Sequence, residues 1–326
     1  MTRRAAVVVL IATLLPYRSA ALAQTSWSMP TDYPQDSMPG QGVTVFAQEL
    51  AGTSGGRLNV TPIFDGASGV KAPGMLAAIG SGRLVAGDVF GGIAGESDPL
   101  LLLSSLPFVT TSVADVRRLF DAARPSYEAA FEKMGVKLLY VTPWPPSGIW
   151  AKAPIRTPED LRGLRIRTYD TTSAAVMTAL GARAVSLSFS EAMPLIKDGS
   201  IDAVLSSGDG GAGRKLWDFF PIYTKLEYAF PLSFAAMNKA AWDNLEPDLR
   251  RVVERAAAQT QAKQWQTIET RLERNEGTMR SNGVTIVTDV SPELRRRASE
   301  AGAAAVESWK TRTGDVGRAI LERYAR

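Results

Sequence analysis

Apolar and polar positions along the chain switch repeatedly between the period of a strand and the period of a helix. Strand patterns fall at residues 27–29, 58–64, 84–90, 136–142, 164–168, 184–189 and 201–205. Helical spacing falls between them, at residues 43–50, 75–79, 113–134, 173–180 and 190–197. Strands that alternate with helices in this way are typical of βαβ units. The pattern predicts an α/β fold with a mostly parallel sheet, and the length of 326 residues favours two domains.

Prolines, glycines and capping residues set the expected ends of these helices. Pro125 interrupts the segment 113–134 and predicts two helices there, the second of which ends at Gly135. Ser190 is the expected N-cap of the helix 190–197.

The segment 246–281 is unusually long for one helix. Its only proline, Pro247, lies in the first turn, and its apolar residues recur at nearly 3.6-residue spacing up to the stop at Asn282 and Gly283. A single helix of this length would measure roughly 50 Å, more than one small domain needs. Two helices that break near residues 259–264 are the alternative; we favour one helix running along two lobes.

The first residues have the pattern of a secretory signal. Arg3 and Arg4 precede an apolar run at residues 5–15, and the small-x-small sequence 21–23 follows. The run is too short to cross a bilayer, which takes about 20 residues. A buried amino-terminal helix is the alternative. We expect cleavage after Ala23 and a secreted, periplasmic protein.

Composition limits the chemistry that the protein can perform. The chain contains 37 Lys and Arg and 33 Asp and Glu, but three arginines fall in the expected signal, which leaves 34 basic residues and a net charge of +1. No basic cluster is interleaved with aromatics, so nucleic acid is not an expected partner. The absence of histidine and cysteine excludes a Ser-His-Asp or Cys-His nucleophile, a zinc site of His and Cys, and disulfides. We expect no enzyme activity, metal or cofactor, although a Ser-Lys dyad or a two-carboxylate hydrolase is not forbidden.

A glycine-rich segment at residues 208–213 matches the G-x-G-x-x-G pattern of dinucleotide-binding proteins. It occurs late in the chain, and the helix expected after it is short and is interrupted at Pro221. A flexible loop at the carboxyl end of a parallel strand is nevertheless where open α/β sheets bind ligands. Ser207 and Asp209 are therefore candidate ligand-binding residues, with a nucleotide site as the alternative.

The segment 154–167, PIRTPEDLRGLRIR, resembles the signature of the substrate-binding subunits of TRAP transporters, the DctP-type family. Shorter matches continue the resemblance in order and spacing, at residues 54–58, 106–108, 179–182, 189–191, 199–202 and 237–242. The resemblance thus covers nearly the whole mature chain. The segment 154–167 is specific, whereas each of the other matches alone is weak.

The resemblance implies a two-lobed periplasmic-binding-protein fold with a long helix spanning both lobes. Lobe I would contain residues 24–147 plus about 231–260, and lobe II residues 148–230 plus about 261–326. Such a protein captures a small organic anion in the cleft between its lobes and delivers it to the small and large permease subunits in the membrane. A ligand-sensing periplasmic protein of the same fold, which presents its ligand to a membrane receptor, is the alternative.

The resemblance also implies two site residues. Arg167 corresponds to the arginine that pairs with the ligand carboxylate, a task that suits a planar guanidinium able to donate two parallel hydrogen bonds. Phe189 corresponds to a ring that packs against the ligand. An interlobe or surface ion pair is the alternative for Arg167, and plain core packing is the alternative for Phe189.

The chain departs from the family pattern at two places. Ser206 stands where an asparagine commonly contacts the ligand, and a second arginine expected within residues 143–150 is replaced by a segment that contains Trp144 and Trp150. Both tryptophans could instead belong to the core. A site with fewer polar groups and more aromatic surface would prefer a larger or less charged acid.

Overall fold

The computed structural model describes residues 25–325. The expected signal peptide and its cleavage after Ala23 lie outside the described residues. Among the helices that are described, none has both the length and the apolar character to span a membrane.

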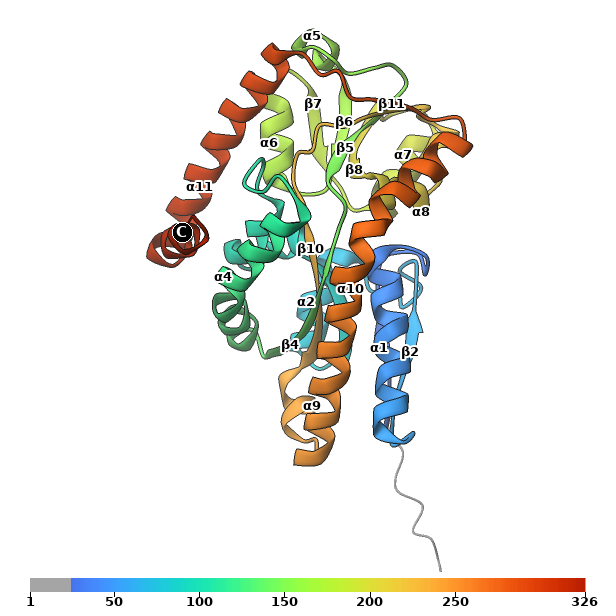
Figure 1. Ribbon diagram of the computed structural model, residues 1–326, viewed down its shortest axis with the longest axis vertical. Coiled ribbons are helices and arrows are strands. Elements are labelled where there is room, and N and C mark those ends of the chain that lie inside the picture. Colours follow the sequence, from blue (N-terminus) through green and yellow to red (C-terminus); the bar gives the residue numbers. More distant parts are fainter. Residues whose placement is uncertain (1–24, 326) are drawn as a thin grey trace, which may run out of the picture.

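The protein consists of two lobes that are joined by extended segments and by a long helix (Figure 1). Lobe I contains a parallel pair, β1-β2, and a three-stranded sheet of order β3-β10-β4. Lobe II contains a six-stranded sheet of order β11-β9-β5-β8-β6-β7. The lobe I strands are β1 (Thr25–Pro30), β2 (Leu58–Ile63), β3 (Ala86–Phe90), β4 (Val136–Pro143) and β10 (Leu232–Asn238). Those of lobe II are β5 (Ser147–Ala151), β6 (Arg165–Thr168), β7 (Arg183–Ser186), β8 (Ala203–Ser207), β9 (Ile222–Thr224) and β11 (Thr285–Val287).

The sheets are mixed, so the expectation of a mostly parallel sheet is wrong. Strand β10 is antiparallel to β3 and β4, and β5 is antiparallel to β8 and β9, whereas the other pairs are parallel. The reason is that β5 enters lobe II directly from β4, and β10 returns to lobe I from β9. A strand that enters from the opposite lobe runs away from that lobe. It is therefore antiparallel to neighbouring strands whose carboxyl ends point toward that lobe. The proposed lobe boundaries near residues 147 and 231 lie close to these two crossings.

Helices cover both faces of the sheets. Lobe I has α1 (Met38–Ser54), α2 (Ala72–Gly80), α3 (Gly91–Ala94), the 3₁₀ helix η1 (Pro99–Ser105), α4 (Val113–Lys133) and α9 (Lys239–Asp243). Lobe II has α5 (Pro158–Leu161), α6 (Thr171–Ala179), α7 (Phe189–Lys197), α8 (Gly208–Gly213) and the 3₁₀ helix η2 (Leu216–Asp218). Two helices contact both lobes: α10 (Pro247–Ser281) and α11 (Pro292–Tyr324).

The single long helix predicted from the sequence is confirmed. Helix α10 is continuous for 35 residues and packs on α1 and β4 in lobe I and on α8 and β11 in lobe II. Its buried residues extend from Val253 to Met279 on one face, which explains why no break occurs near residues 259–264. It ends at the expected position, with Gly283 in the left-handed region.

Three local expectations are wrong. Pro125 lies inside the continuous helix α4, at an exposed position, because buried residues on both sides of it pack onto the lobe I core and outweigh a cost of about 3 kcal/mol. Helix α7 is capped by Ser188 rather than Ser190: the Ser188 side chain and Glu191 form a capping box. The segment 208–213 is not a loop but the short helix α8, capped by Ser207.

The core of lobe I lies on both faces of the β3-β10-β4 sheet. Alternate residues of a strand point to opposite faces, and β10 places Phe234 in the cluster under α4, and Met237 in the cluster under α1 and α10. The core of lobe II surrounds Trp150, which is fully buried in β5. Helix α8 approaches this tryptophan so closely that a Cβ on Gly211 would lie 2.3 Å from its indole ring.

This contact gives the first prediction. Gly211→Ala should lower the free energy of unfolding by about 1–3 kcal/mol, because the methyl group overpacks against Trp150. Gly277→Ala is the matched control: it lies exposed within α10, with no atom within 4 Å of the added Cβ. That change should stabilise the protein by about 0.5–1 kcal/mol. Urea unfolding of both variants measures the difference, and a neutral Gly211→Ala would contradict the packing described.

Candidate functional site

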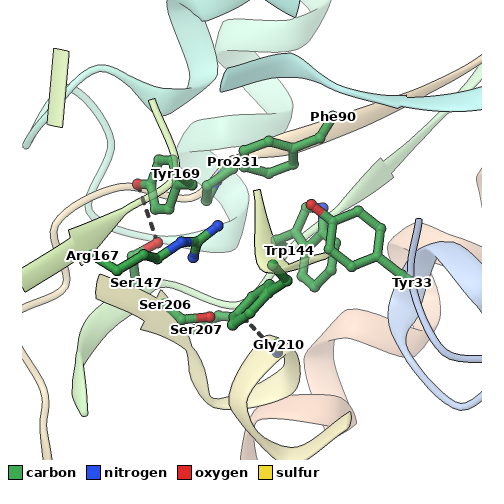
Figure 2. Close-up of a pocket in the computed structure, with 11 residues that line it drawn as sticks. Tyr33, Phe90, Trp144, Ser147, Arg167, Tyr169, Ser206, Ser207, Gly210 and Pro231 are labelled. Carbon is green, nitrogen blue, oxygen red and sulfur yellow. Dashed lines mark hydrogen bonds between the residues drawn. The ribbon is translucent and has the colours of Figure 1, made fainter. Parts of the chain in front are cut away.

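A small cavity lies between the lobes. It is formed where β3 and β4 of lobe I and β6 and β8 of lobe II end, because the carboxyl ends of these strands all point toward the other lobe. Figure 2 shows the lining residues, which are Tyr33, Phe90, Trp144, Ser147, Arg167, Tyr169, Phe189, Ser206, Ser207, Gly210 and Pro231.

Arg167 on β6 is the only cationic residue in this lining. Its side chain is buried, and its Nε donates a hydrogen bond of 2.8 Å to the carbonyl of Leu187. Its Nη1 lies 3.5 Å from the carbonyl of Leu205. None of the ion pairs within residues 25–325 includes Arg167. Burial lowers the pKa of this guanidinium to about 10, so it remains charged at neutral pH. The cavity therefore contains a buried positive charge whose hydrogen-bonding capacity is only partly used.

Phe189, the first residue of α7, lies against this charge. The capping box of Ser188 and Glu191 fixes the helix start and therefore the direction of the ring. The Arg167 guanidinium lies 4.1 Å from the ring centroid, and the Arg214 guanidinium lies 5.4 Å from it. Cation–π attraction thus helps to hold Arg167 in place. Arg214 was not expected at the site from the sequence.

The remaining wall is aromatic. Trp144 donates from Nε1 to Ser233 Oγ at 3.0 Å and meets Tyr33 edge-on at a centroid distance of 4.7 Å. Phe90 meets Tyr169 edge-on at 5.4 Å. These rings leave an apolar box around one end of the cavity.

Hydroxyl groups supply the polar part of the lining. Ser206 and Ser207 end β8, and Ser207 Oγ accepts from the backbone N–H of Gly210 at 3.0 Å, which caps α8. Ser147 at the start of β5 donates from Oγ to Tyr169 Oη at 3.3 Å. Such groups can fix the orientation of a small polar ligand without adding charge.

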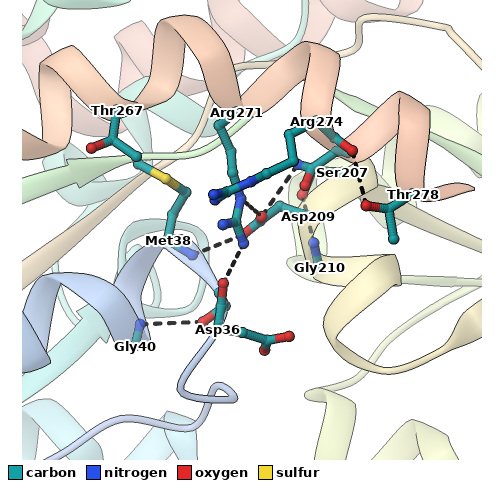
Figure 3. Close-up of polar contacts among 12 residues, drawn as sticks. Asp36, Met38, Gly40, Ser207, Asp209, Gly210, Thr267, Arg271, Arg274 and Thr278 are labelled. Carbon is teal, nitrogen blue, oxygen red and sulfur yellow. Dashed lines mark hydrogen bonds and ion pairs between the residues drawn. The ribbon is translucent and has the colours of Figure 1, made fainter.

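Five of the seven site residues expected from the sequence line this cavity: Arg167, Phe189, Ser206, Ser207 and Trp144. The other two lie outside its lining. Trp150 packs in the lobe II core and donates from Nε1 to the Ser207 carbonyl at 3.3 Å. Asp209 is fully buried on α8 and forms an ion pair with Arg271 of α10, as Figure 3 shows.

Six lining residues were not predicted from the sequence: Tyr33, Phe90, Ser147, Tyr169, Gly210 and Pro231. One of them had a usable signal: Tyr169 directly follows β6, two residues after Arg167, and residues two apart in an extended chain share a face. Tyr33 lies in a loop, where no periodicity indicates the direction of a side chain.

A buried carboxyl group lies next to this lining. Asp170 follows Tyr169, caps α6, and accepts a hydrogen bond of 2.6 Å from the backbone N–H of Ser173 at Oδ1. Its Oδ2 is buried without a hydrogen-bond partner within residues 25–325. Burial raises the pKa of Asp170 to about 6, although Ser173 and the charge of Arg167 oppose the increase.

Comparison with known proteins shows one family. The family described as bacterial extracellular solute-binding protein, family 7 (DctP), matches residues 30–312. Among curated proteins, the 2,3-diketo-L-gulonate-binding periplasmic protein of Escherichia coli is 24% identical over 199 residues, which cover 59% of this chain and 60% of that protein. The matched region therefore spans only about three fifths of that relative's length.

Solved structures match over nearly the whole chain. An extracytoplasmic solute receptor of Bordetella pertussis that binds pyroglutamic acid is 28% identical, with a TM-score of 0.89 over 93% of this chain and 100% of that one. A TRAP solute-binding protein from a marine metagenome, specific for pyroglutamate, is 26% identical, with a TM-score of 0.88 over 93% and 99%.

The ionisation of Asp170 predicts a pH dependence. Its pKa is raised from 3.8 to about 6 in the folded protein. Between these pH values the folded protein retains a proton that the unfolded chain has released, so this group makes stability fall as pH rises from about 4 to 6. Asp170→Asn keeps an N-cap without the titration. The free energy of unfolding of the variant relative to wild type should therefore increase over this range and level off above it. Urea unfolding at pH 4, 5, 6 and 7 measures this, and a pH-independent difference would contradict it.

Proposed function

We propose that this chain, which belongs to bacterial extracellular solute-binding protein family 7 (DctP), captures a small monocarboxylic acid between its lobes for a TRAP transporter. Members of this family are extracytoplasmic solute receptors of TRAP systems rather than enzymes, and they deliver small carboxylates to a membrane permease. The acid, the residues that bind it and the permease partners are the parts that we propose.

The main support is the buried guanidinium of Arg167, which has no acidic partner among residues 25–325. An isolated charge is costly to bury, and the cost is offset when an opposite charge with good hydrogen bonds joins it. A ligand carboxylate is such a group, and a guanidinium can bind it through two parallel hydrogen bonds. Phe189 and two backbone carbonyls hold the arginine in position before the ligand arrives.

The rest of the lining favours a ligand with one charge and a compact, neutral body. Among residues 25–325, Arg167 is the one cationic residue in the lining, so a second carboxylate would find no cation there. The aromatic box would accept an apolar or ring-shaped body, and the hydroxyls of Ser147, Ser206 and Ser207 would contact its polar atoms. Pyroglutamate, a five-membered lactam with one carboxylate, has this chemistry, and three similar structures, 26–28% identical to this chain, are of receptors that bind it.

The mechanism is capture by closure. The ligand enters the open cleft, Arg167 pairs with its carboxylate, and the lobes rotate about the crossings between β4 and β5 and between β9 and β10, while α10 bends or rolls. Closure excludes water, which strengthens the ion pair relative to its value in bulk solvent. The closed form is then recognised by the permease.

We also propose that the signal is cleaved after Ala23, that the mature protein is periplasmic, and that its partners in the membrane are one small and one large permease subunit.

Replacement of Arg167 tests the central contact. Arg167→Met should cost at least about 2 kcal/mol of binding, or roughly 30-fold in Kd for L-pyroglutamate, because the ligand carboxylate loses its partner. The ligand-free protein should not lose stability, because the change removes a buried charge and leaves no opposite charge behind. Isothermal titration and urea unfolding measure the two effects. Unchanged affinity, or a loss of stability without a loss of affinity, would refute the assignment.

Ligand selectivity tests the single-charge argument. L-pyroglutamate should bind at least about tenfold more tightly than succinate or L-glutamate, because an added charged group would be desolvated without a partner. A thermal-shift screen of organic acids, followed by titration of those that shift the melting temperature, gives the comparison. Equal affinity for succinate and for ring-containing monocarboxylates would show that the lining does not select in this way.

A further inference from the structure

Residues 32–38 belong to lobe I but are held by side chains from outside that lobe. They comprise the connection from β1 to α1 and the first residue of α1, Met38, and are called here the 32–38 segment. The segment includes Tyr33, whose ring lines the cavity and packs edge-on against Trp144. Its position therefore determines whether that wall of the cavity is closed.

Asp209 and Arg271 hold one end of the segment (Figure 3). Asp209, on α8 of lobe II, accepts a hydrogen bond of 2.8 Å from the backbone N–H of Met38 at Oδ2. Its Oδ1 accepts from Nε of Arg271 and, at 3.2 Å, from Nδ2 of Asn275. Arg271, on α10, donates in turn from Nη2 to the carbonyl of Asp36.

Arg214 holds the other end. It follows α8 in lobe II, and its Nη2 donates to the carbonyl of Asp32 at 2.5 Å. Its Nη1 lies 3.6 Å from the carboxylate of Asp65, also in lobe I. The same guanidinium faces the ring of Phe189, so this link lies directly behind the cavity wall.

These contacts differ from ordinary surface ion pairs in two ways: the side chains are mostly buried, and they bind backbone atoms of the opposite lobe. The side chains of Asp209 and Arg271 are 0% and 8% exposed. Hydrogen bonds from charged groups to backbone are stronger than neutral ones. Met38 is the first residue of α1, so a carboxylate at this N–H also meets the favourable end of the helix dipole. If the lobes separate, Asp209 and Arg271 can stay paired on α8 and α10, but their bonds to the 32–38 segment are broken.

We propose that Asp209, Arg271 and Arg214 form a closure clamp: they hold the 32–38 segment, and with it Tyr33, against the ligand cavity only when the lobes are closed. They are positioning residues, which act on ligand affinity through the closed state and not through contact with the ligand. The clamp rests on the proposed function only in that a ligand is captured by closure; it does not depend on which acid is bound.

The test uses distances between the lobes and the rate of ligand release. The chain contains no cysteine, so spin labels can be attached to Gln48→Cys on α1 and Lys197→Cys on α7, both exposed. The variants are Arg214→Gln and Asp209→Asn, each in the labelled background. Arg57→Gln is the matched control, because the Arg57–Asp248 ion pair lies within lobe I and does not cross the cleft.

The clamp predicts a specific pattern. Both variants should shift the distance distribution toward longer distances in ligand-free protein, in L-pyroglutamate-bound protein, or in both, and should raise koff for L-pyroglutamate about tenfold or more. Arg57→Gln should change neither readout. Wild-type distances and koff in both variants would overturn the clamp. So would a loss of unfolding stability with koff unchanged, because that is the signature of a structural role alone.

Two further arms keep the outcome clear. Asp209→Asn leaves a buried arginine with a weaker partner, and if it does not fold, Arg214→Gln and Arg271→Lys decide the question. If wild type does not bind L-pyroglutamate, the proposed ligand is wrong, and the acid that shifts the melting temperature most in the screen of organic acids replaces it in the same distance and koff measurements. The same outcomes then support or refute the clamp.

Discussion

A buried guanidinium without an acidic partner in the described chain is the constraint on which the rest of the site depends. Arg167 is kept in place by the carbonyls of Leu187 and Leu205 and by the face of Phe189, none of which cancels its charge. Folding therefore leaves an unfavourable electrostatic term in the cleft, which the large cores of the two lobes outweigh. Under the proposed function, the ligand carboxylate offsets this term, and the site selects for negative charge as a result.

The strand directions explain why residues far apart in sequence meet at this charge. Strands β3, β4, β6 and β8 all end at the cleft, and the two antiparallel strands, β5 and β10, both begin there because the chain crosses between the lobes at those points. Each end delivers a side chain or a short loop to the same cavity. The antiparallel pairs arise because the chain passes from one lobe to the other and back. The segments where it passes, between β4 and β5 and between β9 and β10, are also the crossings about which the lobes can move.

Some of this arrangement could be predicted from the sequence, and some could not. The apolar spacing of residues 246–281 predicted α10, because a pattern that long has few alternatives. The resemblance at residues 154–167 and 189–191 placed Arg167 and Phe189 in one cavity. Tyr33 was not predicted because it lies in a loop, and a loop has no repeating pattern that indicates where a side chain points. Pro125 was misjudged because burial on both sides of it outweighs its local preference.

Asp209 shows most clearly where sequence reasoning stops. An acidic residue beyond the end of a cleft strand is a reasonable candidate for ligand contact, yet its carboxylate is used by Met38 from lobe I and by Arg271 from α10. These partners lie 171 and 62 residues away in the sequence, and only the packing of the two lobes and α10 brings them to Asp209. The result separates two tasks. In the proposed function, Arg167 pairs with the charge of the ligand within the cavity, whereas Asp209, Arg271 and Arg214 bind backbone atoms of the 32–38 segment. Under these two proposals, changes at Ser206 or Trp144 would alter which acid fits without removing the contacts that favour the closed state.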